Sequence, residues 1–270
     1  MNTLSQFLRG MKPAYPPNLN KSPLQNQKLM TSHPQSLKDV GPLGDNWIMP
    51  LPSQMDTFSF HVRPKQLAQL KSKLSKNSYP PSPLQPFELL SAVIWRAVAR
   101  IRNGPEPNPV NIIKKDSRSP IEDIMSLRNN QFVGLVKANF SVAEAHVEEL
   151  AAQIRDMVED ERDQIRNVVG QDPGNSDFII YGSNLTFMNL EEVDFYGFEV
   201  NGLSPRFVNC FIDGIGEEGV ILVLPSPKYC NNDYKDNMKF WSEGRIVTLI
   251  LPKSYMMELK KLLEDWGLII

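Results

Sequence analysis

The sequence has few of the features that mark a secreted, metal-binding or membrane-spanning protein. Cys210 and Cys230 are the only cysteines among its 270 residues, which excludes a disulfide framework and any cysteine spacing suited to zinc. No apolar run reaches the ~18 residues that a bilayer requires, and the N-terminus has no stretch suited to a signal peptide. We therefore expect a cytoplasmic protein with no metal site and no membrane partner.

A strong charge of one sign is also absent. Lysine and arginine number 29 against 31 aspartates and glutamates, which gives a net charge of −2 and excludes the basic surface typical of nucleic-acid-binding proteins. Hydrophobic residues make up 41% of the chain and charged residues 22%, as is typical of globular proteins. We expect a large folded core and no nucleic-acid partner.

Proline is distributed unevenly along the chain. Of the 22 prolines, 17 lie in the first 120 residues, where they favour loops and extended segments. Residues 11–52 show no sustained period of a helix or a strand, although a long connection of this kind is unusual inside a compact domain. We predict an irregular segment over residues 1–52, followed by one α/β domain over residues 53–270.

Hydrophobic periodicity predicts the elements of this domain. Alternation over Asp56–Val62 predicts a strand with Phe58 and Phe60 on one face. Helical spacing of apolar residues predicts four helices, over Pro64–Lys76, Pro86–Ile101, Ser141–Val168 and Lys253–Trp266. The third helix is the longest, and Ser141 and Glu144 are spaced as a capping box at its start.

Four apolar segments near the C-terminus are predicted to be strands of one sheet. They are Phe178–Phe187, Arg206–Asp213, Gly219–Leu224 and Arg245–Leu251, all bounded by turn-forming residues. The glycines between the second and third segments predict an antiparallel hairpin. Apolar residues at every position of the last two segments predict burial on both faces. We expect the helices over 87–101 and 141–168 to cover one face of this sheet.

The chain has only three histidines, so catalysis by an imidazole can be considered for each in turn. His33 lies in a loop, six residues before its nearest downstream carboxylate. His61 alternates with Phe58 and Phe60, so it should face solvent or a polar neighbour on the opposite side of the strand. His146 is expected at the surface of an acidic helix. The spacing predicts no catalytic triad.

Other catalytic and nucleotide-binding motifs are absent too. The sequence contains no Gly-x-Ser-x-Gly, no Walker A loop and no His-Glu-x-x-His. Gly214, Gly216 and Gly219 match the spacing of a dinucleotide-binding loop. The residues that follow them read as a strand and not as the helix that such a loop requires, which favours the hairpin.

Several segments, taken in order, resemble the coenzyme A-dependent BAHD acyltransferases, in particular the fungal trichothecene acetyltransferase-like members. FELLSAVIWRAVARIR over Phe87–Arg102 resembles the family's LSAxxWRxxxRAR helix, and Asp116–Pro120 resembles its DxRxRxxP strand end. Asn130–Gly134 resembles the YxGN turn. VDFYG over Val193–Gly197, ten residues after the GSN of Gly182–Asn184, resembles the DFGWG motif. Together these matches extend over most of the chain.

The resemblance implies a fold, a reaction and a set of structural residues. The implied fold is a chloramphenicol acetyltransferase-like two-layer α/β domain, a mixed sheet with helices on one face. The implied co-substrate is acyl-CoA, for example acetyl-CoA, with a small-molecule acceptor from secondary metabolism and no bound cofactor. Asp194, Phe195 and Gly197 would form a structural motif with Arg118, in which the Asp194 carboxylate pairs with the Arg118 guanidinium. No cofactor-binding residue is carried over.

The departures from the family concern its catalytic residues. The His-x-x-x-Asp motif, whose histidine is the general base, does not occur in the sequence, so no catalytic residue is carried over. Residues 4–24 resemble the stretch that follows this motif in the family. The chain therefore resembles the later three-fifths of such an enzyme and implies a companion N-terminal half. DFGWG is altered to DFYGF, and Leu135 stands where the family has asparagine.

Three hypotheses for function follow. The first is a truncated acyl-CoA-dependent O-acyltransferase homologue that is catalytically impaired when alone. The alternative is a non-enzymatic binding or interaction protein derived from an acyltransferase domain. A third is an enzyme that uses His33 or His61 as a substitute base.

Overall fold

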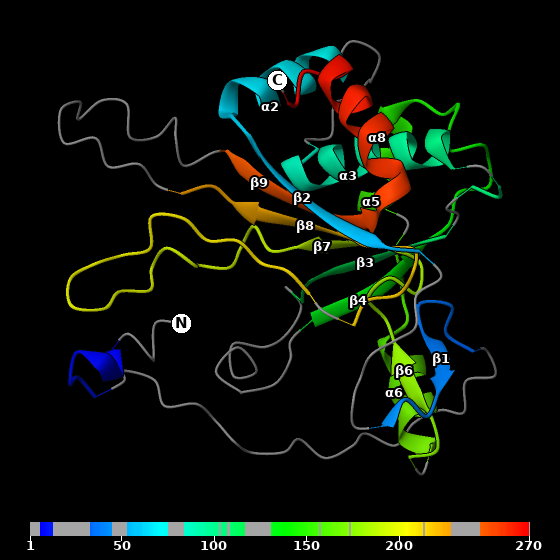
Figure 1. The fold of residues 1–270 in the computed structure, drawn as a ribbon, viewed down its shortest axis with the longest axis horizontal. Coiled ribbons are helices and arrows are strands. Elements are labelled where there is room, and N and C mark those ends of the chain that lie inside the picture. The colour runs from blue at the N-terminus through cyan, green and yellow to red at the C-terminus, as the bar shows by residue number, and fades with distance from the viewer. Residues whose placement is uncertain are drawn as a thin grey trace.

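The fold is a mixed seven-stranded sheet with helices on one face and a small two-stranded sheet beside it (Figure 1). The computed structural model describes residues 6–12, 33–44, 53–74, 84–102, 104–106, 109–116, 131–156, 158–172, 174–212, 214–227 and 244–269. This arrangement confirms the predicted two-layer α/β class.

The main sheet is mixed because β7 runs parallel to both of its neighbours, while the other adjacent pairs are antiparallel. Its strands, in order across the sheet, are β2 (Met55–Val62), β9 (Arg245–Pro252), β8 (Val220–Pro225), β7 (Leu185–Asn189), β3 (Val110–Lys115), β4 (Gln131–Val136) and β5 (Glu159–Asp160). The small sheet pairs β1 (Lys38–Gly41) with β6 (Asp177–Ile179) antiparallel. Strand β1 lies inside the segment predicted to be irregular, whereas the domain boundary at residue 52 stays a prediction.

The helices that lie over one face of the main sheet are α2 (Pro64–Leu74), α3 (Pro86–Ile101), α5 (Val147–Asp156) and α8 (Lys253–Asp265) (Figure 1). Helix α3 is central, because 13 of its residues are buried, Trp95 among them. Pro86 supplies the fixed backbone angle that favours a first helical turn. The Glu88 carboxylate accepts a hydrogen bond from the Gln85 amide that precedes the helix. Helix α6 (Arg162–Gln171) follows β5.

Apolar side chains fill both faces of the main sheet. One cluster joins α2, α3, α5 and α8 to the sheet and includes Phe187, Val223 and Leu249. The second cluster lies on the opposite face and includes Leu222 and Ile250. Every side chain from Val220 to Leu224 is fully buried, which confirms the predicted burial of this strand on both faces. Each such side chain contributes ~1.5–3 kcal/mol to folding.

The predicted long helix over 141–168 is wrong. The segment forms α5, the short edge strand β5 and then α6. Strand β5 pairs with β4, where Gly134 allows the close approach, since a Cβ on it would lie 2.8 Å from the Glu159 carbonyl oxygen. The capping box is wrong as well, because the Ser141 hydroxyl donates to the Glu106 carboxylate. Tertiary contacts therefore override the local helical pattern.

The predicted strand over 178–187 is divided in two. Its first part is β6, its second part is β7, and Gly182 turns the chain between them with a φ of +77°. The predicted strand over 206–213 is wrong: residues 206–212 join no ladder in the described part of the chain, and residue 213 lies outside it. The predicted hairpin is wrong too, because β7 and β9 occupy both sides of β8.

Two glycines allow the chain to enter β8. The Gly216 amide donates to the Tyr181 carbonyl at 2.8 Å, and the Glu218 amide donates to the Gly182 carbonyl at 3.2 Å. A Cβ on Gly182 would lie 2.6 Å from the Gly216 carbonyl oxygen. A Cβ on Gly216 would overlap the Gly182 carbonyl group. Gly216, the middle glycine of the spacing noted in the sequence, therefore allows a close backbone crossing with Gly182.

Replacing Gly216 with alanine should destabilise the protein by about 1–3 kcal/mol, because rigid backbone atoms must move to admit the methyl group. The matched control is Gly170→Ala in α6, where no atom lies within 4 Å of the added Cβ. Alanine is the better helix former by about 0.5–1 kcal/mol, so the control should be as stable as the wild type or more so. Urea unfolding measures the stability of both variants. Equal unfolding midpoints would contradict the claim that the backbone crossing requires glycine at position 216.

Candidate functional site

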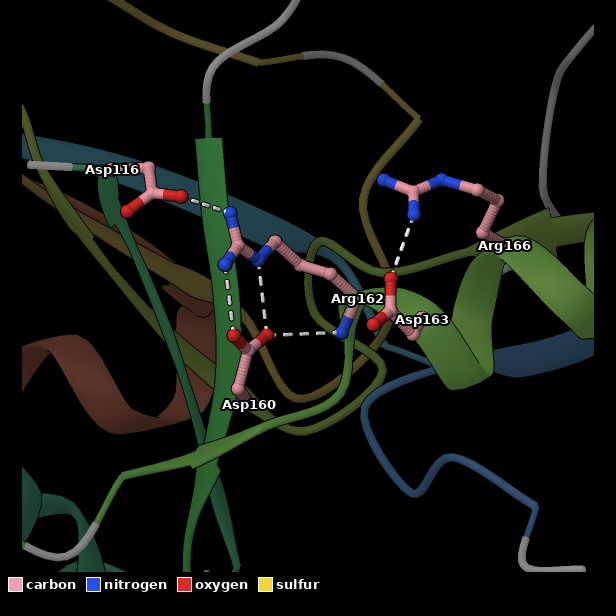
Figure 2. Close-up of polar contacts among 5 residues, drawn as sticks. All are labelled: Asp116, Asp160, Arg162, Asp163 and Arg166. Atoms are coloured by element: carbon pink, nitrogen blue, oxygen red, sulfur yellow. Dashed lines mark hydrogen bonds and ion pairs between the residues drawn. The ribbon is translucent and has the colours of Figure 1, made fainter. Parts of the chain in front are cut away.

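An arginine joins two aspartates at the β3–β4–β5 end of the sheet (Figure 2). The Arg162 guanidinium forms an ion pair with Asp116, which follows β3, and donates to the Asp160 carboxylate at 2.8 and 3.0 Å. Its central carbon lies 5.2 Å from the centre of the Phe132 ring. Hydrogen bonds to Asp160 and Asp116 raise the pKa of Arg162 above its ordinary value. This cluster fastens β5 and α6 to the sheet.

Beside the cluster is a shallow depression of about 260 Å³ lined by charges of both signs, Lys115, Arg155 and Asp156 among them. Arg155 and Asp156 pair with each other at 2.6 Å, and Lys115 lies 3.8 Å from Glu192. No pattern in the sequence pointed to Arg162, which falls inside the helix predicted over 141–168.

Arg162→Ala removes the guanidinium and should destabilise the protein by about 2–3 kcal/mol. This is somewhat less than the cost of losing one partner from a fully buried ion pair. The reason is that Asp116 is only 8% exposed and loses the cation beside it, whereas Arg162 itself is partly exposed. Arg166→Ala is the matched control, since its pair with Asp163 is at the surface (Figure 2) and should contribute under about 1 kcal/mol. Urea unfolding of both variants checks the difference; equal losses would contradict it.

The predicted motif of Asp194, Phe195 and Gly197 forms a compact turn after β7. The Asp194 carboxylate accepts a hydrogen bond from the Gly197 amide at 2.8 Å. A Cβ on Gly197 would collide with that carboxylate, and Phe195 packs against the second apolar cluster. Arg118 lies outside the described residues, so its pairing with Asp194 stays a prediction. Asp116, in the same predicted motif as Arg118, pairs with Arg162.

A polar patch lies on the face of the sheet opposite the helices, where β2, β8 and β9 meet. The His61 Nε2 is 2.9 Å from the hydroxyl of Ser226, which directly follows β8. Gly244 leaves room for this contact, because a Cβ there would lie 2.7 Å from the His61 Nε2. His61 therefore has the polar neighbour that the alternation predicted. Partial burial, and secondarily the charge of Arg63, lower the pKa of His61 below its ordinary value, which favours the neutral imidazole.

Three further polar side chains complete the patch. The hydroxyls of Ser59 in β2 and Thr248 in β9 lie 2.9 Å apart. The Asn209 carboxamide accepts from Thr248 at 2.7 Å and donates toward Ser59 at 3.2 Å. The patch is the candidate site, because it places the exposed imidazole of His61 and the half-buried hydroxyl of Ser59 beside the buried hydroxyls of Ser226 and Thr248. Such groups can bind a polar substrate, and the imidazole can accept a proton.

The histidines lack the partner that a general base normally has. His61 contacts a hydroxyl, and the His33 Nδ1 lies 3.1 Å from the carbonyl of Pro34. His146 is exposed just before α5. In the described part of the chain, no hydrogen bond joins any of the three rings to a carboxylate. The described residues also include no cluster of three potential metal ligands and no helix that is long and apolar enough to cross a membrane.

Comparison with curated proteins finds relatives from Arabidopsis thaliana, whereas no protein-family model matches the chain. Protein ECERIFERUM 26 is 34% identical over 254 residues, which cover 94% of this chain and 54% of that protein. Protein ECERIFERUM 26-like is 35% identical over 91% of this chain and 52% of its own length. Protein ECERIFERUM 2 is 30% identical over 97% of this chain and 56% of its own length. The chain thus spans about half the length of the curated relatives it matches.

Comparison with solved structures identifies the fold. TRI101 of F. graminearum, crystallised with coenzyme A and deoxynivalenol, matches with a TM-score of 0.62 over 90% of this chain and 55% of TRI101, at 16% identity. Vinorine synthase matches with a TM-score of 0.53 over 82% of this chain and 49% of its own, at 12% identity. The chain therefore has the chloramphenicol acetyltransferase-like fold of coenzyme A-dependent acyltransferases, as the sequence resemblance predicted.

The lowered pKa of His61 gives stability a defined pH dependence. Below pH 6.5 the unfolded chain binds a proton at His61 more readily than the folded chain does, so stability should fall as the pH drops through this value. Above about pH 7.5 the ring is neutral in both states and contributes no slope. Urea unfolding of the wild type and of His61→Gln between pH 8 and pH 5.5 checks this; a slope unchanged by the substitution would contradict it.

Proposed function

We propose that the chain is part of a BAHD-type, acyl-CoA-dependent O-acyltransferase homologue that acts in secondary metabolism and is catalytically impaired when alone. One observation carries the proposal: the match to TRI101 covers 90% of this chain but only 55% of TRI101. The order of sequence motifs from Phe87 to Gly197 supports it independently. A companion N-terminal half would complete the protein.

The co-substrate in this proposal is acyl-CoA and the acceptor is a small hydroxylated molecule. The support comes from the structural relatives, because TRI101 enzymes were crystallised with coenzyme A together with deoxynivalenol or T-2. The exposed imidazole of His61 offers a hydrogen-bonding group on the face of the sheet opposite the helices. Coenzyme A and the acceptor would bind between this face and the companion half.

The proposed impairment follows from the chemistry of acyl transfer. Attack of a hydroxyl on a thioester requires a base within hydrogen-bonding reach, and a positioned base contributes about 10²–10⁴-fold to the rate. The sequence has no His-x-x-x-Asp motif, and His61 is paired with a hydroxyl and not with a carboxylate. The orientation of two substrates by two domains is a separate contribution, and the chain alone would lose both.

The alternative is a non-enzymatic binding or interaction protein derived from the same fold. The observation that favours it is the environment of His61, which among the described residues bonds to the Ser226 hydroxyl and not to a carboxylate. In this case coenzyme A or a partner protein would bind without turnover, even when the companion half is present. Binding and turnover therefore have to be measured separately.

The purified chain should release no coenzyme A above background when it is incubated with acetyl-CoA and deoxynivalenol. A thiol-specific assay of the ultrafiltrate measures the release, and TRI101 serves as the positive control. Turnover by the wild-type chain that disappears in His61→Ala would refute the impairment and establish His61 as a substitute base. Turnover by the chain alone that persists in His61→Ala would also refute the impairment, and would show that His61 is not the base.

Calorimetric titration with coenzyme A separates the two candidate functions once the chain is joined to the unmatched part of ECERIFERUM 26. The acyltransferase proposal expects binding together with coenzyme A release from acetyl-CoA. Binding without release supports the non-enzymatic alternative. Absence of both would contradict the coenzyme A-dependent function.

A further inference from the structure

A turn at residues 35 and 36 is held through its main chain by side chains from distant parts of the sequence. Gln35 and Ser36 precede β1 and belong to no helix or strand. The Glu161 carboxylate accepts a hydrogen bond from each of their amides, at 3.0 Å from Gln35 and 2.8 Å from Ser36. Glu161 is only 5% exposed, so water competes little for these bonds. One buried carboxylate therefore binds two consecutive amides.

Three further side chains bind the carbonyl groups of the same turn. The Asn184 carboxamide donates to the Gln35 carbonyl at 2.7 Å. Asn111 donates to the Ser36 carbonyl at 3.2 Å, and the Ser183 hydroxyl lies 2.7 Å from the same oxygen. All four main-chain polar groups of the turn are thus bonded by side chains. We call this set of side chains the latch; it consists of Glu161, Asn111, Ser183 and Asn184.

The latch binds the main chain and leaves little room for one of the two side chains. Gln35 is exposed, whereas Ser36 is fully buried. The Ser36 hydroxyl has no hydrogen-bond partner among the described residues, which is unfavourable for a buried polar group. The position therefore accepts a small side chain without requiring the hydroxyl. A site of this kind binds a turn by its backbone and excludes a bulky residue at the second position.

The segment that carries the turn is only loosely joined to the apolar core. We refer to residues 33–44 as the strap. Leu37 is 6% exposed but belongs to neither apolar cluster. Strand β1 pairs with β6 in a two-stranded sheet apart from the main sheet, and the Asp177 carboxylate accepts from the Leu43 amide at 2.7 Å. Segments with few buried apolar contacts open at a lower free energy than the core does. The strap can therefore open while the main sheet stays intact.

We propose that the strap is a lid on a polar crevice formed by the latch, and that this crevice is a binding site for the main chain of a turn. The chain's own strap is the occupant, through the four bonded groups of Gln35 and Ser36. Asn111 alternates in β3 with Val110 and Ile112 of the first cluster, so the crevice lies on the face of the sheet opposite the helices. The small sheet lies on that side too (Figure 1). The inference goes beyond the proposed function and requires neither coenzyme A nor a companion half.

Hydrogen exchange of the whole chain, resolved to single amides by NMR, tests the strap. We expect the Gln35 and Ser36 amides to exchange by a local opening whose rate does not change in low concentrations of urea. The amides of Val220–Leu224 in β8 should exchange only on global unfolding and should accelerate with urea. Gln35 and Ser36 amides that exchange as slowly as those of β8, with the same response to urea, would overturn the strap as a separate unit.

Glu161→Gln tests the latch. The substitution removes the charge and leaves one acceptor oxygen for two amides, so exchange at Gln35 and Ser36 should accelerate by at least about tenfold. The matched control is Glu159→Gln, because the Glu159 side chain is 62% exposed and pairs with Lys137 at the surface. Exchange of the two amides should be the same in this control as in the wild type. Unchanged exchange in Glu161→Gln would overturn the latch.

A peptide that copies the strap tests the crevice as a binding site. Ser36→Arg should displace the strap, because the buried position excludes a long charged side chain, whereas Ser36→Ala should leave the strap in place. A fluorescein-labelled peptide of residues 33–44 should therefore bind to Ser36→Arg at least about tenfold more tightly than to the wild type or to Ser36→Ala, in which the chain's own strap competes at a high effective concentration. Fluorescence anisotropy measures the affinity, and adding Glu161→Gln to Ser36→Arg should abolish the binding.

Two outcomes of the titration would overturn the binding site. One is the absence of binding to Ser36→Arg, and the other is binding that Glu161→Gln does not weaken. Slow exchange of the β8 amides shows that Ser36→Arg is folded; where that protection is lost, the smaller change Ser36→Leu takes its place.

Light scattering tests a second copy of the chain as the source of the strap. A monomer is expected. A dimer that dissociates on Glu161→Gln would show that the strap of one copy occupies the crevice of another, and would overturn the chain's own strap as the occupant.

Discussion

Burial of both faces of β8 is the constraint on which the rest of the structure depends. A strand whose side chains from Val220 to Leu224 are all removed from water requires strands on both of its edges and apolar layers above and below. Helix α3 and its neighbours supply one layer. The segment after β7 supplies much of the other, through Phe195, Cys210 and Ile212. The two faces of the sheet are therefore covered in different ways, one by helices and one by an extended chain.

Because of this asymmetry, the polar groups that could have a function lie on the face of the sheet opposite the helices. On the helical side almost every side chain that meets the sheet is apolar. On the other side, Ser59 and Thr248 belong to strands and are bonded to each other and to Asn209 of the chain that covers them. His61, on the same face of β2, contacts the Ser226 hydroxyl. Polar side chains are accommodated there because the extended segment supplies hydrogen-bonding partners. The same segment carries Phe207 and Phe211, whose side chains are exposed.

The candidate site could be predicted only in part. The strand alternation correctly placed His61 opposite Phe60, since this depends on the period of two along β2 alone. Its partner Ser226 lies 165 residues away, and no pattern in the sequence connects the two. Arg162 was missed for a similar reason: the apolar spacing around it fits a helix, and only the pairing of β5 with β4 brings it to Asp116, 46 residues earlier in the chain. The pairing of Asp194 with Arg118 remains a prediction from resemblance.

What the sequence by itself determined is the class of the fold and the elements with a strong local pattern. Helices α3 and α8 and strands β2, β8 and β9 were predicted because their hydrophobic period extends over their whole length and survives any arrangement. Only the tertiary structure decided the secondary structure of segments whose hydrophobic period is weaker or ambiguous. Residues 141–168 broke into α5, β5 and α6 because β4 had an open edge. Residues 206–212 stayed outside the sheet because both edges of β8 were already occupied, and which edges are open is a property of the whole fold.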